Sequence, residues 1–464
     1  MLFSSLTFLY WFLPSVLILY FLLPDRFKNF VLLAASLLFY AWGEPRFIVL
    51  MLVTILSAYV HGRLIEATRG RLAERLWLLS SITIALAPLL YFKYANFLID
   101  NLSVLTGTNL PVLKLSLPIG ISFYTFQALS YTVDVYRGRI QAQRKLHLLA
   151  LYITFFPQLI AGPIVRYTDI ETALSRRSHS LENFSSGFTR FSLGLAKKVL
   201  LANELGEFVQ VFRSSGQKSV AFYWLYAVAF SLQIYLDFSG YSDMAIGLGR
   251  IFGFDFPENF RYPFEARSIT EFWRRWHISL GSWFRDYVYI PLGGNRVSGS
   301  RLALNLLTVW TLTGLWHGAE WQFVLWGLFF GLLLLFEKLL PVTGIAAPLR
   351  HAGVLVLVLL SFVIFNAGSL PELWLDVRSL FGVTALPWLS AETLYYTRSY
   401  GAVLLLGAAA STSGPRRLYE YLQQKTSPIH LPELVRVLIV PALLLLVTAY
   451  LLDGAYNPFL YFRF

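Results

Sequence analysis

The sequence predicts an all-α, polytopic membrane protein with about ten to thirteen membrane helices. Of its 464 residues, 56% are hydrophobic and only 14% are charged, whereas about 25% of the residues in an ordinary soluble domain are charged. Apolar runs recur from one end of the chain to the other, and no long segment has the mixed polar composition of a separate soluble domain. Residues 1–464 are therefore expected to form a single integral membrane domain.

Thirteen apolar segments are candidate membrane helices, because a crossing needs about 20 apolar residues, and fewer where the protein thins the bilayer. The first segment lacks a basic n-region and a small-residue cleavage site, so it is expected to be a membrane span rather than a signal peptide. The candidate segments of about 15 residues are short enough to form tilted hairpins or to be partly buried by neighbouring helices. The segments are 2–23, 28–42, 46–60, 76–92, 115–133, 146–162, 188–203, 219–238, 302–316, 320–341, 352–366, 398–410 and 436–452.

Two basic loops, 63–75 and 137–145, are separated by two of these segments and are expected on the same side of the membrane. The positive-inside rule assigns that side to the cytoplasm, which places the N-terminus and the loop 93–114 outside. The formal net charge of +12 is explained by such loops and by anionic headgroups. Nucleic acid is therefore not expected as a partner.

Residues 252–301 differ from the rest because they are rich in aromatic and charged side chains together. Ser268 followed by Glu271 predicts the start of a helix with a capping box, and the turn Gly293–Gly294–Asn295 ends the unit. One face of that helix is expected to carry Trp273, His277, Leu280 and Phe284. Because Arg274, Arg275 and Arg285 lie off this face, the segment is expected to be an in-plane unit at the cytoplasmic surface.

His317 follows one apolar segment and precedes another, so its imidazole is expected within the membrane. An ionisable side chain there is costly and by default functional, although packing beside Trp316 with a hydrogen bond to a neighbouring helix is the alternative. Gly314 and Gly318 flank it at a spacing that allows either close helix approach or access for a substrate. For His277 a packing role and a catalytic role both remain open, and the two imidazoles could face one site. The other histidines are expected to be interfacial: His61, His147, His179, His351 and His430.

Imidazole can remove a hydroxyl proton near neutral pH, and an alcohol activated in this way can attack a thioester. The competing scheme, a serine nucleophile, lacks its usual G-x-S-x-G motif, and there is no Walker-type phosphate loop. The chain has no cysteine, which excludes disulfides, Cys-ligated metals and an acyl group carried on the protein's own thiol. No H-E-x-x-H motif is present, and no metal is expected.

Further polar residues are candidates for binding the acyl donor or for supporting the site. Asp237 and Asp243 are expected to face an interior cavity, and one or the other is expected to pair with an arginine of the in-plane unit. A structural ion pair and a catalytic role both remain open for these two acids. Arginine binds phosphate in a bidentate manner, so the arginines of this unit could bind a phosphorylated donor that approaches from the cytoplasm, with headgroup anchoring as the alternative. The candidates are Arg274, Arg275, Trp276, Arg285, Asp286, Asn295, Arg296, Trp316, Asp237 and Asp243.

Long motifs distributed over most of the chain resemble the membrane-bound O-acyltransferase family, in particular its bacterial alginate O-acetyltransferase membrane-subunit branch. These motifs are residue-specific rather than merely apolar. They include LLAASLLFYAWGEPRF, LPIGISFYTFQALSYTVDVYRG, FFPQLIAGPIVRY, YLDFSGYSDMAIGLGRIFGFDFPENFRYPF, WRRWHISLGSWFRDYVYIPLGGNR and LWHGAEWQFVLWG.

The resemblance implies that His317, in the W-H-G element, is catalytic and that His277, in R-R-W-H, is the second recurrent histidine. It also implies a funnel of helices around a buried histidine, no bound cofactor, and acetyl-CoA as a cytoplasmic substrate. Implied partners are membrane lipids, a serine-hydrolase-like acetyltransferase outside the inner membrane, and the machinery of polysaccharide synthesis and export. Two positions depart from the family pattern: Phe330 replaces a frequent histidine, and Asn366 replaces the usual arginine.

The leading hypothesis is a multi-pass enzyme of the bacterial inner membrane that O-acetylates a secreted polysaccharide such as alginate or cellulose. A transporter or flippase for a polysaccharide or a lipid-linked substrate would also need many spans, but it is expected to show internal repeats, and none is apparent. Acylation of teichoic acid, peptidoglycan or a lipid within the same family differs only in the acceptor.

Overall fold

The structure, a computed structural model, describes residues 1–340, 344–425 and 431–454. In these ranges the chain folds into helices and loops without a β-strand, which confirms the predicted all-α class. All thirteen predicted segments coincide largely with helices. The described residues divide into two compact units: unit 1 contains residues 1–188 and 244–257, and unit 2 contains residues 189–243 and the described part of the chain from residue 258 onward. The prediction of a single integral domain stays a prediction.

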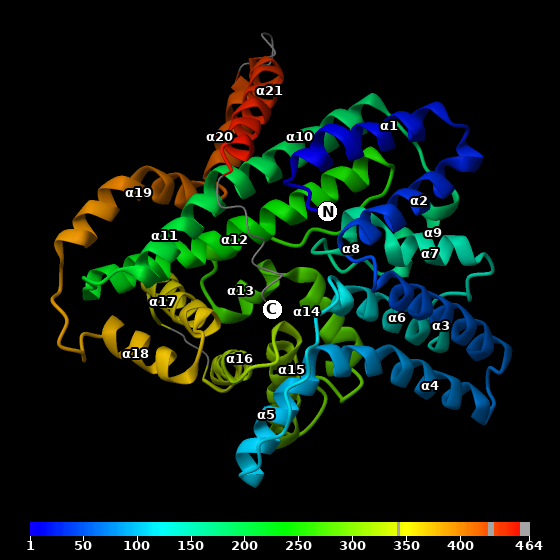
Figure 1. Cartoon of the computed structure of the whole chain (residues 1–464), viewed down its shortest axis with the longest axis horizontal. Coiled ribbons are helices and arrows are strands. Elements are labelled where there is room, and N and C mark those ends of the chain that lie inside the picture. The colour runs from blue at the N-terminus through cyan, green and yellow to red at the C-terminus, as the bar shows by residue number, and fades with distance from the viewer. Residues whose placement is uncertain (341–343, 426–430, 455–464) are drawn as a thin grey trace. The chain divides into compact units, whose positions relative to one another are not determined.

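Unit 1 is built around α3, α4 and α6, which lie side by side (Figure 1). A hydrogen bond between the hydroxyls of Ser81 and Thr132, 3.1 Å apart, joins α4 to α6, and such bonds help to associate helices where no water competes. Its helices are η1 Phe8–Phe12, α1 Leu13–Leu22, α2 Asp25–Gly43, α3 Ile48–Ala67, α4 Leu72–Leu89, η2 Leu90–Tyr94, α5 Ala95–Thr106, α6 Ile121–Tyr136, α7 Leu146–Thr154, α8 Phe156–Leu159 and α9 Tyr167–Ser175.

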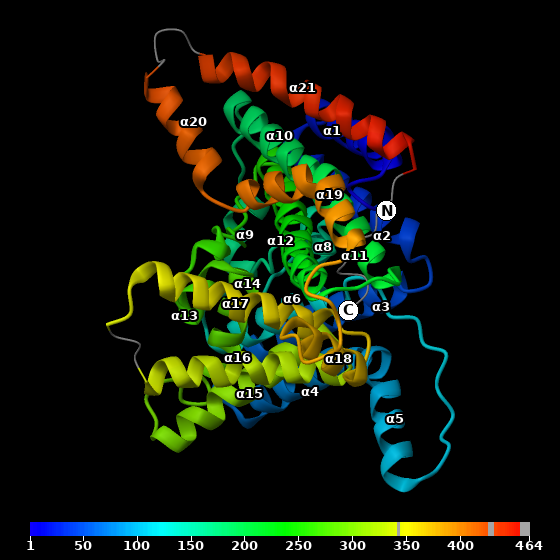
Figure 2. The same ribbon diagram turned by 90° about the vertical axis from the view of Figure 1, so that its left-hand side faces the viewer.

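Unit 2 contains both candidate histidines. Within it α15, α16 and α17 run next to one another (Figure 2), and α13 packs against α16. Two helices, α10 Leu181–Ala196 and α12 Val220–Ile251, contribute residues to both units. The other helices of unit 2 are η3 Lys197–Ala202, α11 Asn203–Ser214, η4 Pro263–Glu265, α13 Ile269–Arg275, α14 Ile278–Phe284, η5 Arg285–Tyr289, α15 Gly299–His317, α16 Trp321–Leu339, α17 Ala347–Asn366, α18 Leu370–Leu380, α19 Ala391–Ala410, α20 Gly414–Lys425 and α21 Leu431–Leu452.

Five helical stretches of the described chain are long and apolar enough to cross a membrane: Ile48–Ala67, Leu72–Thr106, Val220–Ile251, Trp321–Leu339 and Ala347–Asn366. Shorter apolar helices cover Phe8–Leu22 and Val437–Leu452. The total of ten to thirteen spans and the sidedness of the loops stay predictions. The loop expected at 93–114 is corrected in its first half, because α4 continues through the π-helical turn η2 into α5. Pro88 lies two residues before η2 begins, and a proline without its N–H is a usual cause of such irregular turns.

Candidate active site

The single helix expected after Ser268 is in fact two short helices, and the break lies at the second candidate histidine. Ser268 does cap α13, since its side chain accepts a hydrogen bond from the N–H of Glu271. The helix ends at Arg275, however, and His277 adopts a left-handed conformation with φ 42° and ψ 52° before α14 begins. This conformation costs a residue other than glycine about 1–2 kcal/mol, so the surrounding structure must impose it.

Asn259, which sequence reasoning did not single out, stabilises this break. Its backbone carbonyl accepts the N–H of Ile278 at 3.0 Å. Its side-chain Oδ1 lies 3.2 Å from the N–H of Ser279, 2.9 Å from the Ser279 hydroxyl and 3.2 Å from Nδ1 of His277. Asn259 thus binds the first two N–H groups of α14, which would otherwise have no partner within the helix. The only signal in the sequence is a polar residue between two aromatic motif segments.

The structure brings the two predicted histidines together inside unit 2, as the sequence suggested. The centroids of the His277 and His317 rings are 6.4 Å apart, and the residues are only 1% and 5% exposed. His317 is the last residue of α15, and His277 precedes α14. Aromatic rings surround the pair: Trp316, Trp326 and Phe365 lie within 5.4 Å of the His317 ring, and Phe238 lies 4.7 Å from the His277 ring.

Glycines determine how closely the helix that carries His317 approaches its neighbour. A Cβ atom at Gly314 would lie 2.1 Å from the carbonyl oxygen of Phe323, and one at Gly327 would lie 2.3 Å from that of Trp310. At Gly318 a Cβ would overlap the ring of Phe323 at 2.0 Å. The close helix approach predicted from Gly314 and Gly318 is therefore confirmed, and it positions His317 beside α16.

The environment of His277 keeps its imidazole neutral. Burial lowers the pKa of His277 to about 3, because an apolar surrounding disfavours the charged form. A neutral imidazole carries a hydrogen on one ring nitrogen and a lone pair on the other. His277 can therefore act as donor and acceptor at once, whereas a histidinium could only donate.

A cavity of about 1290 Å³ lies in the same unit, between α13, α14, α15, α16 and α17. Its walls are mainly apolar, and it includes Thr313, one helical turn before His317 on α15. Three of the candidates line it, namely Arg274, Arg285 and Asn295. Three further cations that the sequence analysis did not select also line it: Arg267, Lys338 and Arg350. The cavity thus combines an apolar interior with cations that suit an anionic group.

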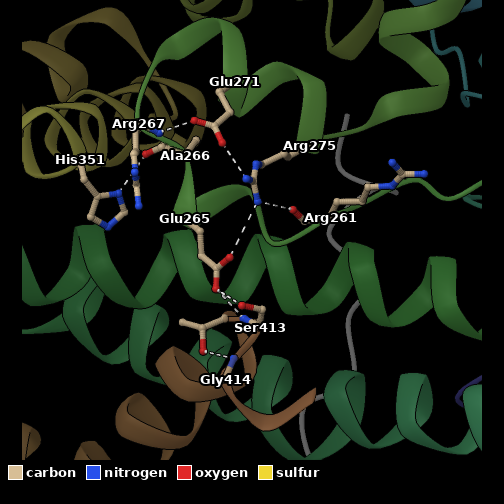
Figure 3. A network of polar contacts seen from close by, with 10 residues as sticks. Arg261, Glu265, Ala266, Arg267, Glu271, Arg275, His351, Ser413 and Gly414 are labelled. Atoms are coloured by element: carbon tan, nitrogen blue, oxygen red, sulfur yellow. Dashed lines mark hydrogen bonds and ion pairs between the residues drawn. The ribbon is translucent and has the colours of Figure 1, made fainter. Parts of the chain in front are cut away.

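Arg275, in contrast, belongs to an ion-pair network (Figure 3). Its guanidinium lies 2.6 Å from Glu271 and 3.8 Å from Glu265. Glu265 in turn accepts the N–H and the hydroxyl of Ser413 at 2.7 and 2.6 Å, just before α20. His351 lies close by, with Nδ1 2.9 Å from the carbonyl oxygen of Ala266. The contacts of Arg275 hold the end of α13 in place.

The acids of α12 do not pair as the sequence suggested. Asp243 contacts Arg190 at 2.8 Å and Lys197 at 2.7 Å, which come from α10 and η3 rather than from residues 252–301. Arg190 also binds Glu258 at 2.6 Å. Asp237 lies 3.0 Å from Lys198, and both are buried. The expectation of an in-plane arginine is corrected, because α10 and η3 supply three cations along this part of α12.

The remaining candidates differ in their surroundings. Trp276 packs in the aromatic core of unit 2, 5.6 Å from the ring of Phe272. Trp316 contacts both histidines, with ring centroids 5.0 Å from His317 and 5.8 Å from His277. Asp286 binds Arg285 at 2.7 Å. Asn295 accepts hydrogen bonds from the hydroxyl of Tyr289 and the ammonium of Lys338. Arg296 follows the predicted turn, where Gly293 and Gly294 have positive φ.

The two departures from the family pattern are accommodated by packing and by hydrogen bonding. Phe330 is fully buried, 4.8 Å from the ring of Trp273 and 5.3 Å from that of Trp326. Asn366 donates to the hydroxyl of Tyr226 at 2.8 Å. Arg213, on α11, also donates to that hydroxyl and pairs with Asp376. An arginine is therefore present close to Asn366, but it comes from another helix.

The other histidines lie outside the pair. In unit 1, His61 is buried rather than interfacial, with Nε2 3.1 Å from the Ser80 hydroxyl, so that expectation is corrected. His179 contacts the hydroxyl of Tyr20, and His147 stacks on Phe30. His430 lies outside the described residues. Among the described residues no cluster of histidine and acidic side chains could hold a metal ion.

Comparisons with known proteins identify relatives of this chain. The profile of the membrane-bound O-acyltransferase family matches residues 145–366, the range that contains both histidines. A protein of Azotobacter vinelandii named "Probable alginate O-acetylase" is 44% identical, over 82% of this chain and 78% of its own length. A protein of the same name from Pseudomonas putida is 39% identical over the full length of both chains. A peptidoglycan O-acetyltransferase of Helicobacter pylori is 35% identical, over 72% of this chain and 70% of its own. These names describe acyl transfer, and a transporter is not favoured.

Proposed function

This chain belongs to the membrane-bound O-acyltransferase family, and on that premise we propose that it O-acetylates a secreted polysaccharide, with His317 as the catalytic residue. Alginate and cellulose are the candidate acceptors. Relatives that carry the name alginate O-acetylase and cover this chain at 39% to 44% identity support acetyl as the group transferred. The observation that carries the proposal is the buried pair of His317 and His277 within the range that matches the family.

The proposed reaction is an acyl transfer with His317 as general base. The imidazole takes the proton of an acceptor hydroxyl while the oxygen attacks the carbonyl carbon of a thioester. The C–O bond forms, the C–S bond breaks, and the proton passes from His317 to the departing thiolate. The chain's lack of cysteine agrees with direct transfer, because it has no thiol of its own to carry the acyl group.

Acetyl-CoA is the proposed donor, and the cavity of unit 2 is its proposed site. The apolar interior suits a flexible thioester arm, and Arg267, Arg274, Arg285, Lys338 and Arg350 supply cations for its phosphates. Thr313 connects the cavity wall to His317 through one turn of α15. Asn295, which shares a hydrogen bond with Lys338, would hold that ammonium at the cavity.

The proposed location is the bacterial inner membrane, which the chain crosses several times, with the donor in the cytoplasm and the acceptor outside. The accepting hydroxyl belongs either to the polysaccharide or to a serine of an extracytoplasmic, serine-hydrolase-like partner that finishes the transfer. The machinery of polysaccharide synthesis and export would then supply the polymer. The apolar helices of both units support the membrane location, and membrane lipids are the surrounding partners.

The first experiment measures the acetyl content of secreted polysaccharide in cells that carry the wild-type protein or His317→Ala, with membrane levels compared by immunoblot. We expect loss of acetyl groups at an unchanged protein level, because one imidazole is small against the apolar area that holds the fold. His147→Gln is the matched control, since it deletes a histidine that stacks on Phe30 outside the pair. Wild-type acetylation by His317→Ala would disprove the assignment, and acetyl lost from peptidoglycan instead would identify a different acceptor.

The donor site is tested in inverted membrane vesicles with radiolabelled acetyl-CoA. Arg274→Gln is expected to raise the concentration of acetyl-CoA needed for half-maximal transfer, because a cation that lines the cavity is lost. Arg416→Gln is the matched control, since Arg416 is exposed on α20, pairs with Glu420 and does not line the cavity. Equal donor dependence in all three proteins would remove Arg274 from the donor site.

A further inference from the structure

Asn259 is a fully buried polar side chain that lies against one of the two histidines. It is 0% exposed and belongs to the loop between α12 and η4. Burial of an amide is costly unless it forms hydrogen bonds. Its Oδ1 contacts His277 and Ser279, 18 and 20 residues later in the chain. We therefore expect the buried amide of Asn259 to hold the neighbouring side chains in a specific arrangement.

The backbone N–H of Ser279 identifies which terminal atom of the Asn259 side chain is the oxygen. The N–H of Ser279 can only donate, and it lies 3.2 Å from the terminal atom of the Asn259 side chain. That atom must therefore be the oxygen, because an NH₂ group there would set two donors against each other. The Ser279 hydroxyl, 2.9 Å away, also donates to it. The usual ambiguity in the orientation of an asparagine amide is thus resolved at this position.

The same oxygen determines which nitrogen of His277 carries the hydrogen. It lies 3.2 Å from Nδ1, and two lone pairs at that distance would repel each other, so Nδ1 must donate. In a neutral imidazole the lone pair then resides on Nε2. We propose that Asn259 is a positioning residue that holds His277 in the Nδ1–H tautomer and leaves Nε2 as its proton-accepting nitrogen. The catalytic use of Nε2 rests on the proposed acyl transfer, whereas the tautomer itself does not.

The backbone of His277 supports a role beyond the capping of α14. Asparagine, serine or aspartate directly before a helix caps it with its own side chain, but here residue 277 is a histidine in a left-handed conformation and the cap comes from Asn259. The T-shaped contact with Phe238 at 4.7 Å fixes the plane of the imidazole. Because the ring is fixed by Phe238 and its hydrogen by Asn259, Nε2 has a defined direction, as a proton acceptor requires.

The tautomer is measured by nitrogen NMR on the full chain, labelled with [¹⁵N]histidine and reconstituted in lipid bilayers. A difference spectrum against His277→Gln assigns the two nitrogens, because Nε2 couples to both ring carbon-bound protons and Nδ1 to one. We expect a protonated Nδ1 and an unprotonated Nε2 at neutral pH. An unprotonated Nδ1 would overturn the proposal. The wild-type spectrum decides this point even where a variant at position 259 fails to fold.

Two substitutions then test whether the Asn259 side chain determines the tautomer of His277. Asn259→Asp keeps an oxygen acceptor and is expected to keep Nδ1 protonated, whereas Asn259→Ala removes the acceptor and is expected to produce a detectable Nε2–H population. A spectrum of Asn259→Ala identical to the wild type would overturn the role of Asn259. A pure helix cap would leave the tautomer of His277 unmoved in both variants.

Acetyl content of the secreted polysaccharide provides the functional readout. A double variant, Asn259→Ala with His277→Gln, is expected to lose no more activity than His277→Gln alone, because Asn259 acts through His277. Additive losses would show an independent role for Asn259 and contradict the proposal. If the protein proved not to acetylate any polymer, these assays would fail while the NMR result stood, so the two failures are distinguishable.

Discussion

The two histidines of the site are held in opposite ways. His317 ends a regular helix, and the packing of α15 on α16 through Gly314 and Gly327 sets its position. His277 lies in a break between two short helices, and hydrogen bonds that Asn259 accepts set its position. Packing is distributed over many contacts, whereas the break depends on a few polar atoms. We therefore predict that His317 leaves its position only when the fold is disrupted, whereas His277 can be displaced while the protein stays folded.

The largest effect is expected where the helix crossing itself is filled. Gly314→Ala should strongly destabilise the protein and abolish acetylation, because its Cβ would lie 2.1 Å from a backbone oxygen that has no room to move. Overpacking of this kind costs about 1–3 kcal/mol or more. The measurement is the melting temperature of detergent-purified protein together with polymer acetyl content.

Gly401→Ala on α19 is the control for this substitution, because nothing lies within 4 Å of a Cβ atom there. Alanine should raise stability slightly at this position, by less than about 1 kcal/mol, through its higher helix propensity. Equal behaviour of the two variants would mean that the crossing does not determine the position of His317.

The second test compares the imidazoles directly. His317→Gln should lower the acetylation rate by about 100-fold to 10,000-fold, the range expected for a lost general base, at an unchanged melting temperature. His277→Gln should cause a smaller loss, since its role is to support the site. Rates are measured in membrane vesicles with acetyl-CoA. A greater loss from His277→Gln than from His317→Gln would reverse the roles assigned to the two residues.

The third test uses the pH dependence of stability to determine whether His277 is buried as a neutral ring. Burial lowers the pKa of His277 to about 3 in the folded protein, whereas an exposed imidazole titrates near about 6.5. Between these values the unfolded chain binds a proton that the folded chain does not, so the free energy of unfolding decreases as the pH falls below about 6.5. From pH 7.5 to pH 5, wild type should lose about 2 kcal/mol more than His277→Gln. Parallel melting-temperature curves for the two proteins would show that His277 is not buried as a neutral ring.

The smallest effect is expected at the network that holds the end of α13, just before His277. Ser413→Ala removes the hydroxyl bond to Glu265 but leaves the backbone bond in place. A single hydrogen bond contributes about 1 kcal/mol, so the melting temperature should fall slightly while acetylation is unchanged. A marked loss of acetylation at full stability would mean that His277 is controlled from α20 as well as from Asn259.

The sequence was sufficient for the features that repeat along a helix or that a motif contains. The all-α class, the cap at Ser268 and the close approach at Gly314 were predicted correctly, and the proximity of His277 to His317, which the sequence left as one possibility, is found in the structure. The break before His277 could not be predicted, because Trp273, His277, Leu280 and Phe284 keep a helical spacing in the sequence even though one residue turns left-handed.

The partners of buried polar groups could not be predicted from the sequence either. Asp243 pairs with Arg190 and Lys197, which lie 53 and 46 residues earlier in the chain. Asn259 contacts His277, 18 residues later. Composition shows that such charges and amides need partners, but only the folded chain shows which of several available cations or donors comes close. The hydrogen-bonding side chains of the site were therefore predicted less well than its helices.

The aromatic rings around the histidine pair are expected to limit hydrolysis of the thioester. Trp316, Trp326, Phe365 and Phe238 present mostly carbon atoms to the imidazoles, so water has few polar groups to bind there. A thioester beside a general base is otherwise open to hydrolysis, which would consume the donor without modifying any polymer. For the proposed transfer at His317 we therefore expect little hydrolysis of the thioester when no acceptor hydroxyl is present, so that donor consumption follows the supply of polysaccharide.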